Sequence, residues 1–498
     1  MSARVGLAVG AALLALLPAA AMAQTIHLEA ENARPEGPTA AAVRPAATAE
    51  EGSRPMRTGY SGEGYVTGFV RPDDRLVFTF AAPAAGVYDL RIAYACDSRK
   101  GYTLDVNGLK MADIFTASAG FSVHEGGKVE LDEGANTIAI DRGWGYFDID
   151  YIELTPSAPV EPVARPSAGV NDVHASPAAR ALLARVDEAY GRGMLLGVYD
   201  DEDAQFVFDS TGFRPAIMGG DLLKYSPSFA ARSGTKEKEV ERLIARSGEG
   251  YAITLSWHWN SPLGLIDAML PDSKGGPEVD ARWYRGFYTE ATRFDLAVAM
   301  ADPGSKERAA LLGDIDAIAV QLRRLEAAGV PVLWRPLHEA EGGWFWWGAK
   351  GPGPFVQLWR LLYDRLVNVD GIHNLVWVYT SGGDPAWYPG DRYVDVVGID
   401  AYPEDLRDPQ LALWEKLLGQ FAGRKPLAIS EYGGVPDVAR MQRLGAEWAY
   451  AVSWSGKLGP RKNGAEDLRR IYGGDGALKM AVPAPAAAAP VAAPVVAR

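Results

Sequence analysis

Two glutamates follow apolar runs that are typical of buried strands. Glu339 comes shortly after Val330–Leu333, and Glu431 comes directly after Leu427–Ser430. A pair of carboxyls can hydrolyse a glycosidic bond, because one protonates the leaving oxygen while the other attacks the anomeric carbon or activates water. The distance between the carboxyls distinguishes retention from inversion, and the sequence does not give it. The alternative for Glu431 is a surface carboxylate at a strand end.

The chain around Glu339 combines imidazole, carboxyl and indole side chains. His338 precedes Glu339, Glu341 follows two positions later, and three tryptophans come next: Trp344, Trp346 and Trp347. Indole faces desolvate a carboxyl, which raises its pKa and suits a general acid, and they also stack on sugar rings. The alternative is a core aromatic cluster with solvated carboxylates beside it. Glu341 has no assigned role, and a carboxylate at the rim of the site is its simplest interpretation.

Two histidines, His258 and His338, raise the question of a metal site. A catalytic zinc ion needs three close protein ligands. The sequence has no His-Glu-x-x-His helix, and His338 follows a strand instead. Hydrogen bonds that orient a sugar or a carboxylate are therefore favoured over metal-assisted hydrolysis. A serine hydrolase is weaker still, because no Gly-x-Ser-x-Gly elbow occurs.

Beyond about residue 171, apolar runs alternate with amphipathic helical stretches. We expect strands near Gly193–Val198, Ala216–Gly219, Tyr251–Trp257, Val330–Trp334, Asn374–Tyr379, Val394–Ile399, Pro426–Ser430 and Ala449–Trp454. Helical patterns separate several of them, at Lys236–Ser247, Ala309–Ala328 and Phe355–Val367. This alternation predicts a (β/α)8 barrel. A doubly wound open sheet is the structural rival, and its nucleotide-binding form is weakened because no Gly-x-Gly-x-x-Gly follows a strand.

The working residues of such a barrel gather at the carboxyl ends of its strands. The third to eighth strands deliver Ser256–Asn260, Arg335, His338, Glu339, Asp384, Trp387, Tyr388, Asp400, Tyr402, Glu431, Tyr432 and Trp454. Carboxyls, imidazoles and aromatic rings therefore converge on one face. Residues 261–308 form a long insertion after the third strand, and long loops of this kind usually shape the site.

The first part of the chain has a different pattern of apolar and polar residues. Apolar and polar residues alternate in Arg75–Phe80, Gly86–Tyr94, Tyr102–Val106, Asn136–Ile140 and Phe147–Leu154. Short alternating strands separated by turns such as Asn107-Gly108 predict a β-sandwich module over residues 24–156. A Pro-rich linker is expected at 157–170, the barrel at 171–477, and a disordered Ala/Pro-rich tail at 478–498.

Residues 1–23 have the pattern of a secretory signal peptide. Arg4 precedes an apolar run, and Ala21-Met22-Ala23 is a cleavage site of small residues before Gln24. Cys96 is the only cysteine, so an exported chain would have no internal disulfide. The net charge of −13 argues against nucleic acid and anionic membranes as partners.

Ordered motifs in the barrel region resemble glycoside hydrolase family 26, the family best known for endo-β-1,4-mannanases. The motifs are Ser256–His258, Trp334–Glu339, Gly342–Gly348, Gly398–Pro403, Ala428–Gly433 and Val452–Trp454. They fall in the family's order across roughly residues 175–475. The resemblance implies a retaining (β/α)8 enzyme with its acid/base on strand four and its nucleophile on strand seven.

Roles carried over from this resemblance fall on matching positions. Glu339 corresponds to the acid/base and Glu431 to the nucleophile. Arg335 and Tyr402 correspond to groups that orient the nucleophile, and His338 to the family's histidine before the acid/base. Contacts to the sugar are implied for His258, Trp344 and Trp454. No cofactor is implied for catalysis.

The N-terminal module resembles the family 35 carbohydrate-binding modules. The resemblance rests on Glu29–Asn32, Gly59–Tyr65 and Phe147–Glu153. It implies a structural calcium held by Glu29, Glu31 and Asp150, with plain solvated carboxylates as the alternative. Trp144 is the expected sugar platform, although a buried core tryptophan is the alternative, and Tyr60 is a weaker candidate.

These observations predict a secreted or periplasmic retaining glycoside hydrolase that cleaves β-1,4-mannosidic linkages in mannan, glucomannan or galactomannan by double displacement. The first alternative keeps the fold and mechanism but acts on mixed-linkage β-glucan or β-1,3-xylan. The second is a non-catalytic polysaccharide-binding protein, which the presence of both glutamates disfavours. The expected partner is a β-mannan-type polysaccharide, with no nucleic acid or membrane partner, and a monomer is expected.

Overall fold

The computed structural model describes residues 25–44, 57–166, 169–272 and 276–480. The predicted signal peptide and residues 481–498 of the predicted tail lie outside these ranges. The chain divides into two compact units, one ending at Ala158 and one starting at Pro159, except that residues 109–111 group with the second. Each unit is described by itself below.

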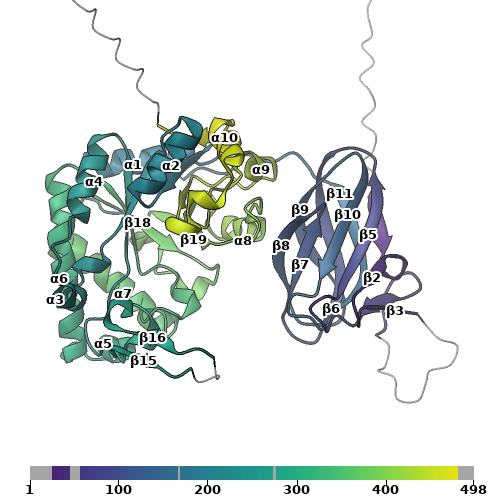
Figure 1. Cartoon of the computed structure of the whole chain (residues 1–498), viewed down its shortest axis with the longest axis horizontal. Coiled ribbons are helices and arrows are strands. Elements are labelled where there is room, and N and C mark those ends of the chain that lie inside the picture. The colour runs from purple at the N-terminus through teal and green to yellow at the C-terminus, as the bar shows by residue number, and fades with distance from the viewer. Residues whose placement is uncertain (1–24, 45–56, 167–168, 273–275, 481–498) are drawn as a thin grey trace, which may run out of the picture. The chain divides into compact units, whose positions relative to one another are not determined.

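The second unit is a closed barrel of parallel strands (Figure 1). Its strands are β12 (Met194–Val198), β13 (Ile217–Asp221), β14 (Ala252–Trp257), β17 (Val332–Pro336), β18 (Leu375–Thr380), β19 (Val396–Ala401), β20 (Leu427–Tyr432) and β21 (Tyr450–Ser453). They pair in this order, and β12 pairs with β13 to close the ring. The predicted eight-stranded barrel is therefore confirmed.

The barrel strands are mainly apolar toward their amino ends, because both of their faces are covered. Every residue of β12, β14, β17, β18, β20 and β21 is buried. The helices of the unit are α1 (Pro177–Ala189), α2 (Asp201–Thr211), α3 (Pro227–Ser233), α4 (Glu239–Gly248), α5 (Leu296–Ala301), α6 (Lys306–Ala327), α7 (Pro352–Tyr363), α8 (Leu411–Phe421), α9 (Val438–Arg443) and α10 (Ala465–Gly473). A π-helical turn, η6 (Asp364–Val369), continues α7.

Side-chain caps set where several of these helices begin. Ser176, Asp200 and Ser305 each accept a hydrogen bond from a backbone N–H in the first turn of α1, α2 and α6. The longest helix, α6, buries Leu311, Ile315 and other apolar residues at helical spacing. Short loops then return the chain to the next strand.

The segments on either side of the barrel contact it more closely than predicted. A short strand, β22 (Ala477–Leu478), pairs in parallel with β12, and Met480 forms a bridge with Arg214. Residues 478–480 therefore belong to the barrel and not to a disordered tail. Part of the predicted linker, from Pro159 onward, also groups with the barrel unit. Val163 packs against the barrel core, which explains this grouping.

The predicted insertion after the third strand has structure of its own. A two-stranded hairpin, β15 (Ala268–Leu270) and β16 (Val279–Ala281), is followed by short turns and by α5. Toward its end the insertion contacts the loop that follows β17, since Tyr288 forms an isolated β-bridge with Phe345.

The first unit is a sandwich of two antiparallel sheets (Figure 1). One sheet holds β1 (Ile26–Glu29), β3 (Ala41–Val43), β4 (Tyr65–Thr67), β6 (Gly86–Cys96), β9 (Ser118–Leu131) and β11 (Asp148–Pro156). The other holds β2 (Arg34–Glu36), β5 (Arg75–Ala82), β7 (Lys100–Val106), β8 (Leu109–Phe115) and β10 (Gly134–Asp141). The predicted β-sandwich is confirmed, and its core includes Phe69 stacked on Phe147.

Of the helices in the described ranges, none is long and apolar enough to cross a membrane.

Candidate active site

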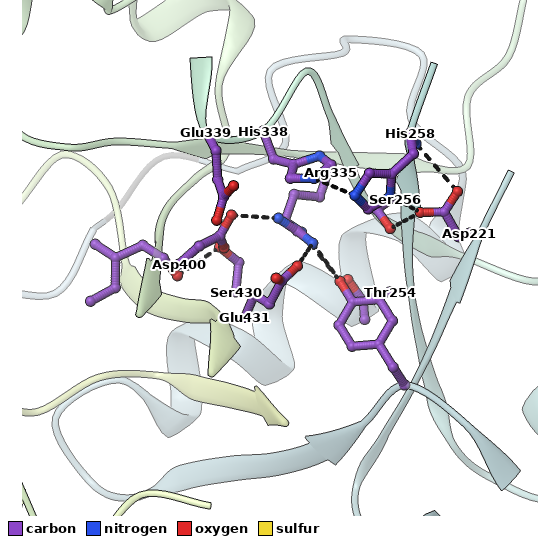
Figure 2. Close-up of polar contacts among 12 residues, drawn as sticks. Asp221, Thr254, Ser256, His258, Arg335, His338, Glu339, Asp400, Ser430 and Glu431 are labelled. Carbon is purple, nitrogen blue, oxygen red and sulfur yellow. Dashed lines mark hydrogen bonds and ion pairs between the residues drawn. The ribbon is translucent and has the colours of Figure 1, made fainter. Parts of the chain in front are cut away.

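Glu431 lies at the end of β20 and is 5% exposed. Its Oε2 accepts a hydrogen bond from Nη2 of Arg335, and its Oε1 accepts one from the hydroxyl of Tyr402. Figure 2 shows the Glu431 carboxyl beside the Arg335 guanidinium. Because a donor contacts each oxygen, the carboxyl is fixed in one orientation. A carboxylate held in this way suits nucleophilic attack.

Arg335 is the buried cation at the centre of the site. Its Nη1 donates to Asp400 over 2.6 Å, and its Nη2 and Nε donate to the hydroxyl of Tyr199 over 2.8 and 3.2 Å. Ser430 donates to the other Asp400 oxygen over 2.9 Å. The single guanidinium therefore bridges two carboxylates. Such a network is costly to break, because removing one member leaves a buried charge without its partner.

Glu339 lies on an unusual turn directly after β17. Its φ is 53° and that of Leu337 is 52°, in the left-handed region that residues with side chains adopt at a cost. The short helix η5 (Ala340–Gly342) follows, and Trp344 Nε1 donates to Glu339 Oε2 over 2.9 Å. Burial, and then the charge of Glu431, raise the pKa of Glu339. Glu339 therefore keeps its proton to higher pH, as a general acid requires.

A chain of hydrogen bonds links two histidines to the half-buried Asp221 (Figure 2). Nδ1 of His258 lies 2.5 Å from Asp221, and its Nε2 lies 3.1 Å from Nε2 of His338. Burial lowers the pKa of His258, but the Asp221 carboxylate outweighs it, so the net shift is upward. Burial, Arg335 and His258 together hold the pKa of His338 well below its usual range. His338 is therefore neutral at physiological pH.

A cavity of about 430 Å³ opens beside His258. Its lining includes Tyr199, Asp221, Phe287 and Trp454. The Trp454 ring is half-buried, with its centroid 4.5 Å from that of Tyr199 and 5.9 Å from that of His258. A cavity that combines aromatic walls with carboxyl and imidazole groups suits a sugar, which has apolar faces and polar edges.

The other tryptophans of the region differ in burial. Trp346 and Trp347 are buried, and their indole nitrogens donate to the carbonyls of Trp259 and His338 over 2.7 and 2.9 Å. Trp344 is 46% exposed. The core-cluster interpretation therefore holds for Trp346 and Trp347, and Trp344 alone of the three faces solvent.

In the module, Trp144 is 58% exposed. Its ring lies flat on the chain, because a Cβ at Gly101 would come within 2.9 Å of it. The alternative of a buried core tryptophan is therefore wrong. Tyr60 is half-buried and lines a cavity of about 210 Å³ together with Phe121 and Tyr151.

The three carboxyls expected to hold calcium lie around residues 61–63, where Glu31 accepts a hydrogen bond from the backbone N–H of Glu63 and the other two contact Ser61. Its backbone N–H donates to both oxygens of Asp150, over 3.0 and 3.1 Å, and its hydroxyl donates to Glu29 over 2.7 Å. Burial, then Glu29 and Glu31, raise the pKa of Asp150 to about 6. One oxygen of Glu31 is buried without a hydrogen-bond partner. Within the described ranges, however, no three histidine, cysteine or acidic side chains converge closely enough to hold a metal.

Comparison with known proteins identifies the barrel. The sequence model of Glycosyl hydrolase family 26 matches residues 172–478. A mannan endo-1,4-beta-mannosidase of Thermothelomyces thermophilus is 42% identical over 421 residues, which cover 84% of each chain. The chain belongs to glycosyl hydrolase family 26. A mannan endo-1,4-beta-mannosidase B of a Piromyces species is 29% identical and covers 88% of this chain and 73% of its own.

Solved structures agree with the family 26 assignment. A GH26-CBM35 beta-(1,4)-mannanase of Podospora anserina is 38% identical, covers 91% of this chain and 97% of its own, and superposes with a TM-score of 0.65. A beta-mannanase from a symbiotic protist of a termite, solved with a gluco-manno-oligosaccharide, is 28% identical, covers 65% of this chain and 98% of its own, and has a TM-score of 0.53. The model of carbohydrate-binding module family 35 matches residues 40–157.

The predicted catalytic-site residues of this family 26 enzyme lie at one end of the barrel. Hydrogen bonds and ring contacts connect Glu431 with Arg335 and Tyr402, His258 with His338 and Trp454, and Glu339 with Trp344. Two site residues were not predicted, Tyr199 and Asp221. They directly follow or end β12 and β13, so the strand-end rule that found the other residues would have found them too.

Glu341 has a definite place in the fold. Its carboxylate accepts hydrogen bonds from the backbone N–H groups of Gly382 and Asp384, over 2.6 and 3.3 Å. It therefore ties the loop after β17, which carries Glu339, to the loop after β18. Its side chain is half-exposed, so a position at the rim is compatible with these two hydrogen bonds.

Proposed function

We propose that this family 26 hydrolase is a retaining endo-β-1,4-mannanase that acts by double displacement. Glu431 attacks the anomeric carbon, while Glu339 protonates the leaving oxygen. Water then attacks the glycosyl-enzyme with Glu339 as the base. Two carboxyls and water are sufficient for these steps, so no cofactor is required for the reaction.

The observation that carries this proposal is that the two carboxyls have different surroundings. Glu431 is held by a guanidinium and a phenol, whereas Glu339 has a raised pKa and a single indole donor. A carboxyl with a raised pKa suits the acid, and a carboxyl that two donors hold in one orientation suits the nucleophile.

The same contacts support the change of role of Glu339 between the two steps. The charge of Glu431 contributes to the raised pKa of Glu339. Once Glu431 is esterified, that charge is gone, and the pKa of Glu339 falls. Glu339, which has given its proton to the leaving oxygen, therefore stays ionised and is the base that the second step needs.

Two measurements test the mechanism. Glu431→Ala should lower kcat by roughly 10⁴-fold or more. It also takes one partner from the buried Arg335, so the melting temperature should fall, and a folded circular-dichroism spectrum is the control for the loss of activity. Proton NMR early in the reaction should show the β-anomer of the new reducing end first. Near-normal activity of the variant, or the α-anomer first, would refute the proposal.

The names of the relatives support mannan as the substrate, since the two described above are mannan endo-1,4-beta-mannosidases. Initial rates on mannan, glucomannan, galactomannan, lichenan and β-1,3-xylan test this directly. Mannan or glucomannan should give the highest kcat/KM. Products of several lengths from mannohexaose would support endo action, whereas single-sugar release would contradict it.

We further propose that the module binds the same polysaccharide, with Trp144 as a platform. An exposed indole that lies flat on the backbone is available for stacking on a sugar ring. Trp144→Ala should weaken retention of the chain on insoluble mannan without changing kcat on mannohexaose. Tyr88→Phe, which changes a buried module tyrosine, is the matched control and should bind normally.

We also propose that the chain is exported. The N-terminal pattern supports cleavage before Gln24, which N-terminal sequencing of the mature protein would test.

We propose, in addition, that the module binds calcium. The raised pKa of Asp150 and the unpartnered oxygen of Glu31 support a cation near Ser61, although the carboxyls do not converge in this structure. Millimolar calcium should raise the melting temperature of the wild type and leave Asp150→Asn unchanged. No shift in the wild type would contradict the site.

A further inference from the structure

Asp221, at the end of β13, makes an unusually complete set of contacts for a residue outside the catalytic pair. Its Oδ2 lies 2.5 Å from His258 Nδ1 and accepts from the Ser256 hydroxyl over 2.8 Å. Its Oδ1 accepts from the backbone N–H of Leu223 over 2.6 Å and from that of His258 over 3.2 Å. Both the carboxylate and the imidazole plane are therefore fixed relative to the backbone.

In the contact between the two histidines, one of the two nitrogens must carry the proton. Nε2 of His258 and Nε2 of His338 lie 3.1 Å apart, so one nitrogen donates and the other accepts. His338 is 1% exposed beside Arg335, which disfavours a charge on it. Asp221 holds a proton on Nδ1 of His258 and favours its charged form. His258 therefore donates and His338 accepts.

Other charged groups also face His258. Glu431 raises the pKa of His258, and Arg335 lowers it. Glu339 lies close enough for His258 to lower its pKa. The cavity beside the ring is lined further by Asp200, Lys224, Glu237 and Glu239. The remaining neighbours of the ring are aromatic: Phe287, Phe345 and Trp454. Asp221 alone of these acidic groups is hydrogen-bonded to the imidazole.

We propose that Asp221 is a positioning residue for the hydrolysis proposed above. Its carboxylate fixes the plane and the proton of His258, and through His258 it sets which nitrogen of His338 carries hydrogen. His338 adjoins the acid/base Glu339 in the chain. His258 lines the cavity and lies close enough to Glu431 for that carboxyl to raise its pKa. Without Asp221, the shared proton can move to His338, and the ring of His258 can turn.

The test compares Asp221→Asn with the wild type by kinetics and by imidazole NMR. The chain has six histidines, so selective labelling gives few signals, and His258→Asn identifies the relevant one. We expect kcat on mannohexaose to fall by roughly 10- to 100-fold, with a smaller change in KM. The titration of His258 should move to lower pH. Formate should partly restore kcat in Asp221→Ala, because it can replace the missing carboxylate.

Asp395→Asn is the matched control, since Asp395 is a buried aspartate at the opposite ends of the strands, where it accepts from Asn171 and Trp377. It should cost stability without changing kcat. If Asp221→Asn does not fold, Ser256→Ala removes one hydrogen bond to the same oxygen and should give smaller shifts in the same direction.

The proposal is overturned if Asp221→Asn keeps kcat within twofold, or loses activity while His258 titrates as in the wild type. A wild type that does not hydrolyse mannan would overturn the proposed function instead. In that case the NMR titration still reports whether Asp221 controls His258.

Discussion

The indole nitrogen of Trp344 donates a hydrogen bond to the carboxyl of Glu339 over 2.9 Å, from a side chain that is 46% exposed. This bond favours the ionised form of Glu339 and opposes both burial and the charge of Glu431, which raise its pKa. Trp344 therefore does more than offer a face to the sugar, because it also limits how strongly Glu339 holds its proton.

Replacing Trp344 by phenylalanine should consequently move the alkaline limb of the kcat/KM profile to higher pH. The aromatic face remains, but the donor to Glu339 is lost, so the pKa of Glu339 rises and the acid stays protonated longer. A pH series of kcat/KM on mannohexaose measures the shift. Trp414→Phe, at a buried position away from Glu339, is the control. A limb that moves to lower pH would contradict this assignment.

Glu341 should matter for catalysis although it does not reach the reacting atoms in our mechanism. Glu341→Ala releases the backbone of Gly382 and Asp384 and loosens the turn that carries Glu339. We expect kcat to fall about 10-fold with little change in KM. Glu341→Gln keeps one acceptor oxygen, so its kcat should lie between those of the wild type and the alanine variant. If the alanine variant has the kcat of the wild type, the tie between the loops is unimportant.

Asp314 should make stability decrease as the pH rises. It is buried on α6, where its carboxyl accepts from Trp259 Nε1 over 2.8 Å, and burial raises its pKa from 3.8 to about 7. The folded state binds the proton more tightly than the unfolded state. This contribution is therefore complete below pH 4 and is lost as the pH rises through 7, with a full size on the order of 4 kcal/mol.

Asp314→Asn keeps an acceptor for Trp259 and removes the titration. Its melting temperature should fall less than that of the wild type between pH 5 and pH 8. Asp316→Asn, at a half-exposed position on the same helix, should retain the pH dependence of the wild type. Parallel melting curves for the wild type and Asp314→Asn would contradict the prediction.

The segment before α1 should stabilise the barrel. Val163 packs on the barrel core, and its backbone is hydrogen-bonded to the carboxyl of Glu447. A chain that starts at Asn171 should melt roughly 3–8 °C below one that starts at Pro159, because it leaves this apolar surface uncovered. Val163→Ala should reproduce part of the loss. Val173→Ala, at a position that is 78% exposed, should not.

The barrel strands were predictable because a strand that is buried on both faces is a continuous apolar run. Met194–Val198 is an example, with all five residues apolar and buried. The edge strands of the module were harder. Ala41–Val43 is a short run of small residues, and Ser118–Leu131 contains two adjacent glycines and little alternation. Their pairing depends on neighbouring strands that a local pattern does not contain.

In the site, residue type and position at strand ends were enough to indicate the catalytic carboxyls. The contacts that these carboxyls and their neighbours make could not be predicted in the same way. That Tyr199 and Asp221 contact Arg335 and His258 depends on the closure of the barrel, which brings β12 and β13 beside the other strands. Likewise, Trp344 and Trp346 cannot be distinguished from the sequence. The packing of the loop exposes Trp344 and buries Trp346.

The charge balance around Arg335 has a consequence for inhibitor design. One guanidinium is shared by Asp400 and Glu431, and Glu339 brings a third carboxyl to the same place. Sugar mimics whose ring nitrogen is protonated carry their charge where the anomeric carbon would lie. They should therefore compete with oligosaccharide more strongly than their neutral lactam counterparts, and their advantage should shrink at pH values where the amine is uncharged.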